Sequence, residues 1–135
     1  MLQIHPEPWA TMKAHAEKTY PSECCGAFLG NGGQVTQAIP LDNVYQGGQA
    51  DRFEVRPADL VKVERDSRAQ GLELLGIYHS HPDCDAYFSQ TDLENSCPWY
   101  KSIVLSVKQG RFDHASAFET NDEQTAATPV DLRTD

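Results

Sequence analysis

The chain has 135 residues and a formal net charge of -9, a length that fits one domain and leaves no room for two cores of ordinary size. Hydrophobic residues make up 39% and charged residues 23%, which predicts a folded chain rather than a disordered acidic one. The acidic excess argues against a nucleic-acid binder and against a protein that binds anionic membranes.

The first half of the chain is predicted to form a helix and three strands. In order, these are a helix over residues 6–19, strands over 27–30 and 34–41, a polar loop over 43–50 and a short strand over 52–55. Pro6 and Pro8 suit the first turn of a helix, and Pro21 follows its end. Asn31-Gly32-Gly33 is a strong turn signal, so the first two strands are expected to form a hairpin.

The second half is predicted to alternate helices with buried strands. In order, these are a helix from Pro57 to Gly71, a strand over 74–78, a short helix starting near Ser89, a strand over 101–107 and an edge strand over 112–118. We therefore expect a single α/β domain over residues 1–119, with a mixed central sheet flanked by two longer helices and a short one. Residues 120–135 are polar and contain proline, which predicts a frayed tail.

The lack of a recognisable signal peptide or membrane span in the sequence leads us to expect a cytoplasmic protein. The N-terminus has no basic region followed by an apolar run, and no stretch approaches the roughly 20 apolar residues that span a bilayer. The four cysteines, Cys24, Cys25, Cys84 and Cys97, are then expected to be reduced. None of them forms a Cys-x-x-Cys pair, which argues against a zinc ribbon or a thioredoxin-like site.

Two histidines follow the buried strand that is predicted over residues 74–78. Alternate side chains of an extended segment share one face, so His79 and His81 are expected to point the same way and Ser80 the opposite way. Pro82 favours an extended conformation at His81 and ends the ladder. Two imidazoles are therefore expected at a sheet end, where open α/β sheets often place their sites.

A carboxylate completes a candidate zinc site. Two imidazoles and one carboxylate are a common catalytic zinc set that leaves a fourth position open for water, and Asp92 is the natural third ligand. Alone, a His-x-His pair is more often a surface feature, and Ser89 with Asp92 is also a plain capping box. A capped first turn would hold Asp92 in place, so the structural and functional interpretations are compatible.

The spacing of these residues resembles that of the JAMM (MPN-plus) metalloproteases. Their signature is a distant glutamate, His-[Ser/Thr]-His-Pro, then a serine and an aspartate, which here are Glu23, His79-Ser80-His81-Pro82, Ser89 and Asp92. The segment Pro21–Gly30 is similar to the family's Pro-x-Glu-x-Cys-Gly-x-Leu-x-Gly, with the apolar pair slightly shifted. Asn43 and residues 52–55 match its middle section. The resemblance covers residues 5–118.

The resemblance implies a role for each residue of the signature. His79, His81 and Asp92 would bind one Zn²⁺, Glu23 would act as the general base, and Ser89 would donate a hydrogen bond to the oxyanion. Ser80 is interpreted as structural. Small stand-alone members resemble peptidases that trim residues beyond the C-terminal Gly-Gly of ubiquitin-like or sulfur-carrier proteins. The segment between Asp92 and Lys101 is too short for a second zinc site, which favours this simpler type over a reader of polyubiquitin linkages.

Three other functions compete with the peptidase. A non-catalytic binding module of the same fold would be expected to lack metal ligands, yet all five functional positions are present. A zinc-dependent nucleobase deaminase would need His-x-Glu and Pro-Cys-x-x-Cys, which are absent. A catalytic thiol at Cys24 or Cys25 would need a base and an oxyanion site of its own. Whether the bond is a peptide or an isopeptide, and the oligomeric state, stay open at this point.

Overall fold

The computed structural model describes residues 1–134, which form one sheet and three helices. The strands are β1 (Leu2–Ile4), β2 (Cys25–Asn31), β3 (Gln34–Leu41), β4 (Glu73–Pro82), β5 (Lys101–Lys108), β6 (Arg111–Thr120), β7 (Ala127–Val130) and β8 (Leu132–Arg133). The helices are α1 (Pro6–Thr19), α2 (Pro57–Ala69) and α3 (Gln90–Glu94). Within the described residues, no helix combines the length and hydropathy needed to cross a membrane.

The sheet is mixed, as the sequence predicts. Its strand order is β7-β6-β5-β4-β2-β3-β1-β8. β4 and β5 run parallel at its centre, and β1 runs parallel to both β3 and β8. The remaining neighbours are antiparallel, including the predicted hairpin of β2 and β3. The parallel pair places the carboxyl ends of β4 and β5 at the same edge, where a site can form.

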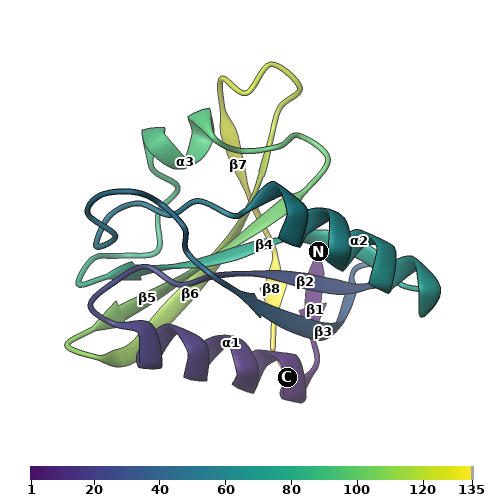
Figure 1. Ribbon diagram of the computed structural model, residues 1–135, viewed down its shortest axis with the longest axis horizontal. Coiled ribbons are helices and arrows are strands. Elements are labelled where there is room, and N and C mark those ends of the chain that lie inside the picture. The colour runs from purple at the N-terminus through teal and green to yellow at the C-terminus, as the bar shows by residue number, and fades with distance from the viewer. Residues whose placement is uncertain (135) are drawn as a thin grey trace.

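The two longer helices cover opposite faces of the sheet (Figure 1). Met12 of α1 packs in one core cluster with Phe28 and Tyr78. Val63 of α2 packs in a second cluster with Ala27 and Leu29. Neighbouring residues of a strand face opposite sides, so Tyr78 faces α1 and the next residue, His79, faces the α2 side.

A glycine at the centre of the sheet allows β4 to lie between β2 and β5. A Cβ at Gly76 would overlap the carbonyl oxygen of Lys101 and the ring of Phe28. We expect Gly76→Ala to lower the free energy of unfolding by about 2–3 kcal/mol, because overpacking forces the backbone to shift. Urea unfolding would measure the loss. Gly48→Ala is the control, since a Cβ there meets no atom within 4 Å; equal stabilities of the two variants would contradict the prediction.

The predicted strand over residues 52–55 is wrong, because this segment is irregular in the structure. Within residues 1–134 it pairs with no strand, and it is held instead by the side chain of Asn43. The Asn43 amide donates to the carbonyls of Glu23 and Arg52 at 3.0 Å each, and its oxygen accepts from the amides of Tyr45 and Glu54. One polar side chain therefore replaces the ladder that the sequence pattern predicts.

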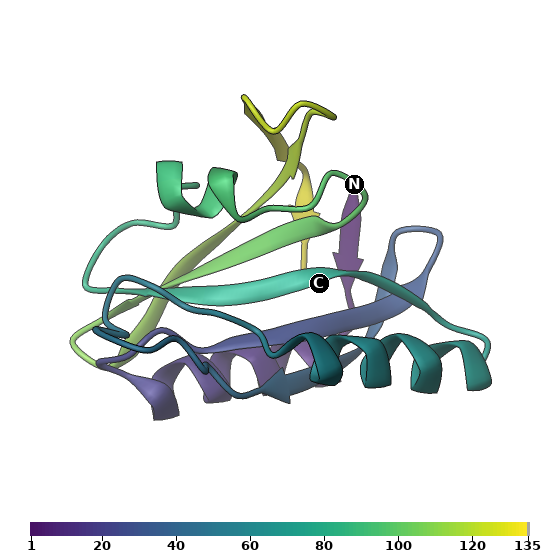
Figure 2. The same cartoon turned by 45° about the horizontal axis from the view of Figure 1, so that its top comes forward.

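The C-terminal part of the chain differs from the frayed tail that was expected. Residues 127–130 form β7, which pairs with β6, and residues 132–133 form β8, which pairs with β1 (Figure 2). The strand predicted over residues 112–118 is therefore not an edge strand, because β7 covers its outer side. β1 and β8 are too short to produce a sequence pattern, and their partners lie far away along the chain.

Candidate metal centre

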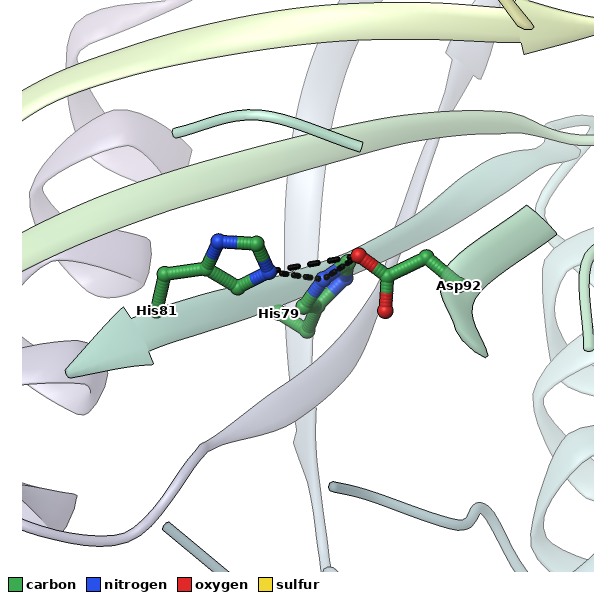
Figure 3. A group of neighbouring side chains, drawn as sticks. All are labelled: His79, His81 and Asp92. Carbon is green, nitrogen blue, oxygen red and sulfur yellow. Dashed lines mark hydrogen bonds and ion pairs between the residues drawn. The ribbon is translucent and has the colours of Figure 1, made fainter. Parts of the chain in front are cut away.

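Three side chains converge on one point at the end of β4 (Figure 3). The Nε2 atoms of His79 and His81 lie 3.3 Å apart, and Oδ2 of Asp92 lies 3.2 Å from each of them. The side chains of both histidines are almost fully buried, at 2% and 4% exposed, and that of Asp92 is 8% exposed. The structure therefore brings together the three residues that the sequence analysis proposed as ligands.

β4 carries the two histidines further into the sheet than the sequence predicts. The strand continues through Pro82 because β5 pairs with it from Gly76 opposite Lys101 to Pro82 opposite Val107. His79 and His81 therefore sit inside a paired strand, and the ladder includes Pro82, which was expected to end it. Side chains on a paired strand are held more rigidly than side chains on a loop, which suits a preorganised site.

A capping box fixes Asp92 at the start of α3. The hydroxyl of Ser89 accepts from the Asp92 amide at 3.0 Å, and Oδ2 of Asp92 accepts from the Ser89 amide at 3.1 Å. The expected short helix is present, with Ser89 as its N-cap. Burial by itself would raise the pKa of Asp92, but hydrogen bonds with His79 and His81 outweigh it and hold that pKa well below its usual range.

The rings of both histidines are held from outside the centre. Nδ1 of His81 donates to the carbonyl of Asp85 at 3.0 Å. Because a carbonyl only accepts, Nδ1 carries a proton, and Nε2 is the nitrogen that faces the other two ligands. The ring of Phe53 stacks on His79 with centroids 4.6 Å apart, and Tyr87 lies edge-on to His81 at 4.9 Å. Neither aromatic residue carries a sequence signal for a contact with the metal centre.

Glu23 lies immediately before β2, on the same side of the sheet as the histidines. Cys25 is opposite His79 in the β2–β4 register, so Glu23 falls opposite His81, two residues further along the strand. Its backbone is held by the carbonyl of Gln49 and the side chain of Asn43. The residue is only 3% exposed, and its Oε1 atom has no hydrogen-bond partner within residues 1–134. An unpaired buried carboxyl is costly, which marks Glu23 as a functional candidate.

Burial raises the pKa of Glu23 to about 9, and the negative charges of Asp92 and Asp51 add to this rise. Between pH 4.5 and about 9, Glu23 of the metal-free protein is therefore protonated in the folded state and ionised in the unfolded state. Its contribution lowers the free energy of unfolding as the pH rises through this range. His15, whose pKa is lowered by burial, acts in the opposite sense.

We expect Glu23→Gln to gain stability relative to the wild type as the pH rises, because glutamine does not ionise. In metal-free samples, the gain between pH 5.5 and 8.5 should be at least about 1.4 kcal/mol, the equivalent of one pKa unit. Urea unfolding of both proteins at the two pH values measures it. The comparison cancels His15, which is present in both proteins, and a pH-independent difference would contradict the raised pKa.

The residues next to these groups have structural roles. Ser80 faces away from the centre, and its hydroxyl accepts from the Cys24 amide at 2.8 Å while its own amide donates to the Cys24 carbonyl. Burial raises the pKa of Cys24 to about 11 and that of Cys25 to about 12. Thiolates are therefore scarce at neutral pH, which argues against a cysteine nucleophile.

The chemistry of the three donors fits a zinc ion. Two imidazole nitrogens and one carboxylate oxygen are ligands that zinc prefers in catalytic sites, where a fourth position stays open. Nε2 of His81 faces the group, and the carboxylate of Asp92 is ionised. The buried Oε1 atom of Glu23 is a polar group that still needs a partner. These residues could hold the metal and position a water molecule beside it.

A cavity of about 400 Å³ adjoins the centre on the side of His79 and Asp92. Its walls come from the irregular segment 52–55, from α2 and α3 and from the segment that follows α3. About half of the side chains that line it are apolar or aromatic, among them Phe53, Val55, Ile77, Phe88, Trp99 and Tyr100. Trp99 is 76% exposed, so the cavity opens beside a large exposed aromatic ring.

Comparison with known proteins relates the chain to named peptidases. A desampylase from Haloferax volcanii is 34% identical over 89 residues, which cover 64% of this chain and 63% of that protein. A probable TtuB-protein conjugate cleaving protease from Thermus thermophilus is 33% identical over 98 residues, covering 73% and 64%. The CysO-cysteine peptidase of Mycobacterium tuberculosis is 25% identical and covers 98% and 91%. The chain thus spans just under two thirds of the first two relatives.

Solved structures share the fold over nearly the whole chain. A protein from Desulfitobacterium hafniense superposes with a TM-score of 0.84 at 23% identity, covering 100% of this chain and 93% of that one. A JAB1/MPN domain protein from Archaeoglobus fulgidus gives a TM-score of 0.63 at 17% identity, covering 98% of both. The family described as prokaryotic homologs of the JAB domain matches residues 6–120. The resemblance noted in the sequence is confirmed, and the chain belongs to this family of prokaryotic JAB domains.

Proposed function

We propose that this chain is a zinc-dependent peptidase that hydrolyses the bond after the C-terminal Gly-Gly of a ubiquitin-like or sulfur-carrier protein. The observation that carries the proposal is the convergence of His79, His81 and Asp92 beside a buried glutamate whose Oε1 atom has no partner among the described residues. The names of the relatives support the substrate class, since they describe a desampylase, a conjugate-cleaving protease and a CysO-cysteine peptidase.

In this proposal His79, His81 and Asp92 hold one Zn²⁺, which when bound supplies Lewis acidity and makes water more acidic. Glu23 accepts a proton from the attacking water and delivers it to the leaving nitrogen as the C–N bond breaks, which yields a carboxylate and an amine. A nearby cation favours the ionised form of a carboxyl, so the high pKa of metal-free Glu23 is compatible with a base in the loaded protein.

Ser89 would stabilise the oxyanion through its hydroxyl proton. Its oxygen accepts from the Asp92 amide, which leaves the O–H free to donate. We expect Ser89→Ala to lower kcat by about 10²-fold, the usual effect of losing one oxyanion donor. Ser89→Thr keeps both the cap and the hydroxyl and should retain most of the activity, so steady-state kinetics of the pair checks the role. Equal activities of the two variants would contradict it.

The cavity beside His79 is where an extended substrate tail would lie. Phe53 and Val55 line one side, and Trp99 and Tyr100 line another. An extended tail could also bind along residues 43–55 by strand addition. The irregular segment has part of its backbone bonded internally, since Val44 donates to the Glu54 carbonyl. Apolar contacts with the cavity walls therefore form the larger part of the proposed tail binding.

The test is a cleavage assay read by mass. The zinc-loaded chain would be incubated with a sulfur-carrier protein that bears a short extension after its Gly-Gly. We expect the extension to be removed at Gly-Gly and the reaction to stop when a chelator is added. Zinc bound without cleavage would reject this substrate class. Neither zinc nor cleavage would favour a non-catalytic binding module, the alternative that the intact donor set argues against.

A further inference from the structure

Residues 83–86 follow β4 and lie beside His81. The carbonyl of Asp85 accepts from Nδ1 of His81 at 3.0 Å and also from the amide of Tyr87 at 2.9 Å. This contact determines which nitrogen of His81 carries the proton and how its ring is turned. The position of the 83–86 segment therefore sets the orientation of one ligand of the candidate metal centre.

The β5–β6 hairpin contacts each of these four residues. The backbone amide of Asp83 donates to the Val107 carbonyl at 2.6 Å, and the Ser106 hydroxyl donates to the Cys84 carbonyl at 2.5 Å. The Lys108 ammonium donates to the Asp85 carboxylate at 2.7 Å. The Ala86 amide donates to Nε2 of His114 at 3.0 Å. The hairpin thus acts as a clamp on the segment that holds His81, although it contributes no ligand itself.

Within this clamp, His114 is the residue whose donor and acceptor atoms are both determined by their partners. A backbone amide only donates, so Nε2 of His114 must accept from Ala86 and the ring proton must be on Nδ1, which donates to Asp113 at 2.6 Å. Ala86 is only 5% exposed, so its N–H needs this acceptor. By contrast, the side chains of Lys108 and Asp85 are 44% and 73% exposed, so their ion pair is expected to contribute little to holding the 83–86 segment in place.

We propose that His114 is a positioning residue for the metal centre. It holds the Ala86 amide, and through the adjoining peptide it holds the Asp85 carbonyl where Nδ1 of His81 meets it. His114 contacts none of the three ligands and takes no part in the chemistry. The proposal rests on the proposed function, because it assumes that His79, His81 and Asp92 bind a metal.

The test compares metal affinities rather than activity. Zinc and cobalt affinities are measured by chelator competition, and the visible absorption of the cobalt-loaded protein is recorded. We expect His114→Ala to weaken zinc binding by about 10-fold, the lower end of the effect of losing an outer partner of a ligand, and to change the cobalt spectrum. His114→Gln places an amide oxygen near the former Nε2 and should restore most of the affinity. His5→Ala is the control, since His5 is exposed and bonds to Gln34 at the other end of the molecule.

Each outcome separates this inference from the proposed function. A wild-type chain that binds no zinc would reject the proposed function whatever His114 does. A wild-type chain that binds zinc, with His114→Ala matching His5→Ala, would overturn the inference alone, as would a glutamine variant as weak as the alanine one. The side chain of His114 is 40% exposed, so its removal should leave a folded protein. If the alanine variant does not fold, His114→Asn, whose amide is too short to reach Ala86, replaces it in the comparison.

Discussion

Glu23→Gln should retain zinc at one ion per chain while its activity falls by about 10³-fold, within the range that general acid–base catalysis contributes. Glutamine has the shape of glutamate but cannot accept the proton of the attacking water. Glu23 is not among the three converging donors, so its replacement leaves the ligand set intact. Zinc content measured by elemental analysis, together with single-turnover cleavage, separates the two effects.

The matched control for this variant is Glu94→Gln, which makes the same change on the exposed side of α3. Glu94 bonds only to Gln90 among the contacts of its side chain that the structure describes, and it does not line the cavity. It should cleave at the wild-type rate. Full activity of Glu23→Gln would remove Glu23 from the reaction, and loss of zinc from that variant would make it a ligand rather than a base.

Local sequence pattern was sufficient for the bounds of two elements and for the placement of the ligands. The first helix was predicted with the bounds that α1 has, and the second strand with those of β3, because prolines and a glycine turn mark their ends. Alternation along a strand correctly placed His79 and His81 on one face. The capping box likewise correctly placed Ser89 and Asp92 at the start of a helix. These are local effects that one segment determines by itself.

Contacts between distant segments could not be predicted from the local sequence pattern. Glu23 alone would be interpreted as a solvated loop carboxylate, and only the resemblance to a known family pointed to it. Its burial arises because residues 43–49 fold over it, through bonds from Asn43 and to Gln49. His114 gave no signal, because a single histidine on a strand that alternates polar and apolar residues has no motif. The segment 52–55 was wrongly predicted as a strand, because the residue that holds it in an irregular conformation, Asn43, lies nine residues upstream of Arg52 and outside the local pattern.

Asp92→Asn should lower zinc affinity by at least about 10²-fold, at the upper end of what changes around a ligand cost, and should abolish cleavage. The amide keeps an oxygen that can accept from Ser89, so the start of α3 is expected to stay capped. The substitution removes the negative charge of Asp92, whose ionised form is favoured by the contacts with His79 and His81. A neutral amide is a poor ligand for zinc.

Thermal denaturation with and without zinc measures the Asp92 effect directly. A ligand that binds only the folded state stabilises it by about 2.7 kcal/mol when present at 100 times its Kd. Wild-type protein and Glu94→Gln should therefore show a clear rise in Tm on addition of zinc, and Asp92→Asn should show almost none at the same concentration. An equal rise in Asp92→Asn would mean that the ion binds elsewhere. Because Glu23→Gln should keep the rise and lose cleavage, while Asp92→Asn loses both, the two variants together distinguish the residue that moves the proton from the residue that holds the metal.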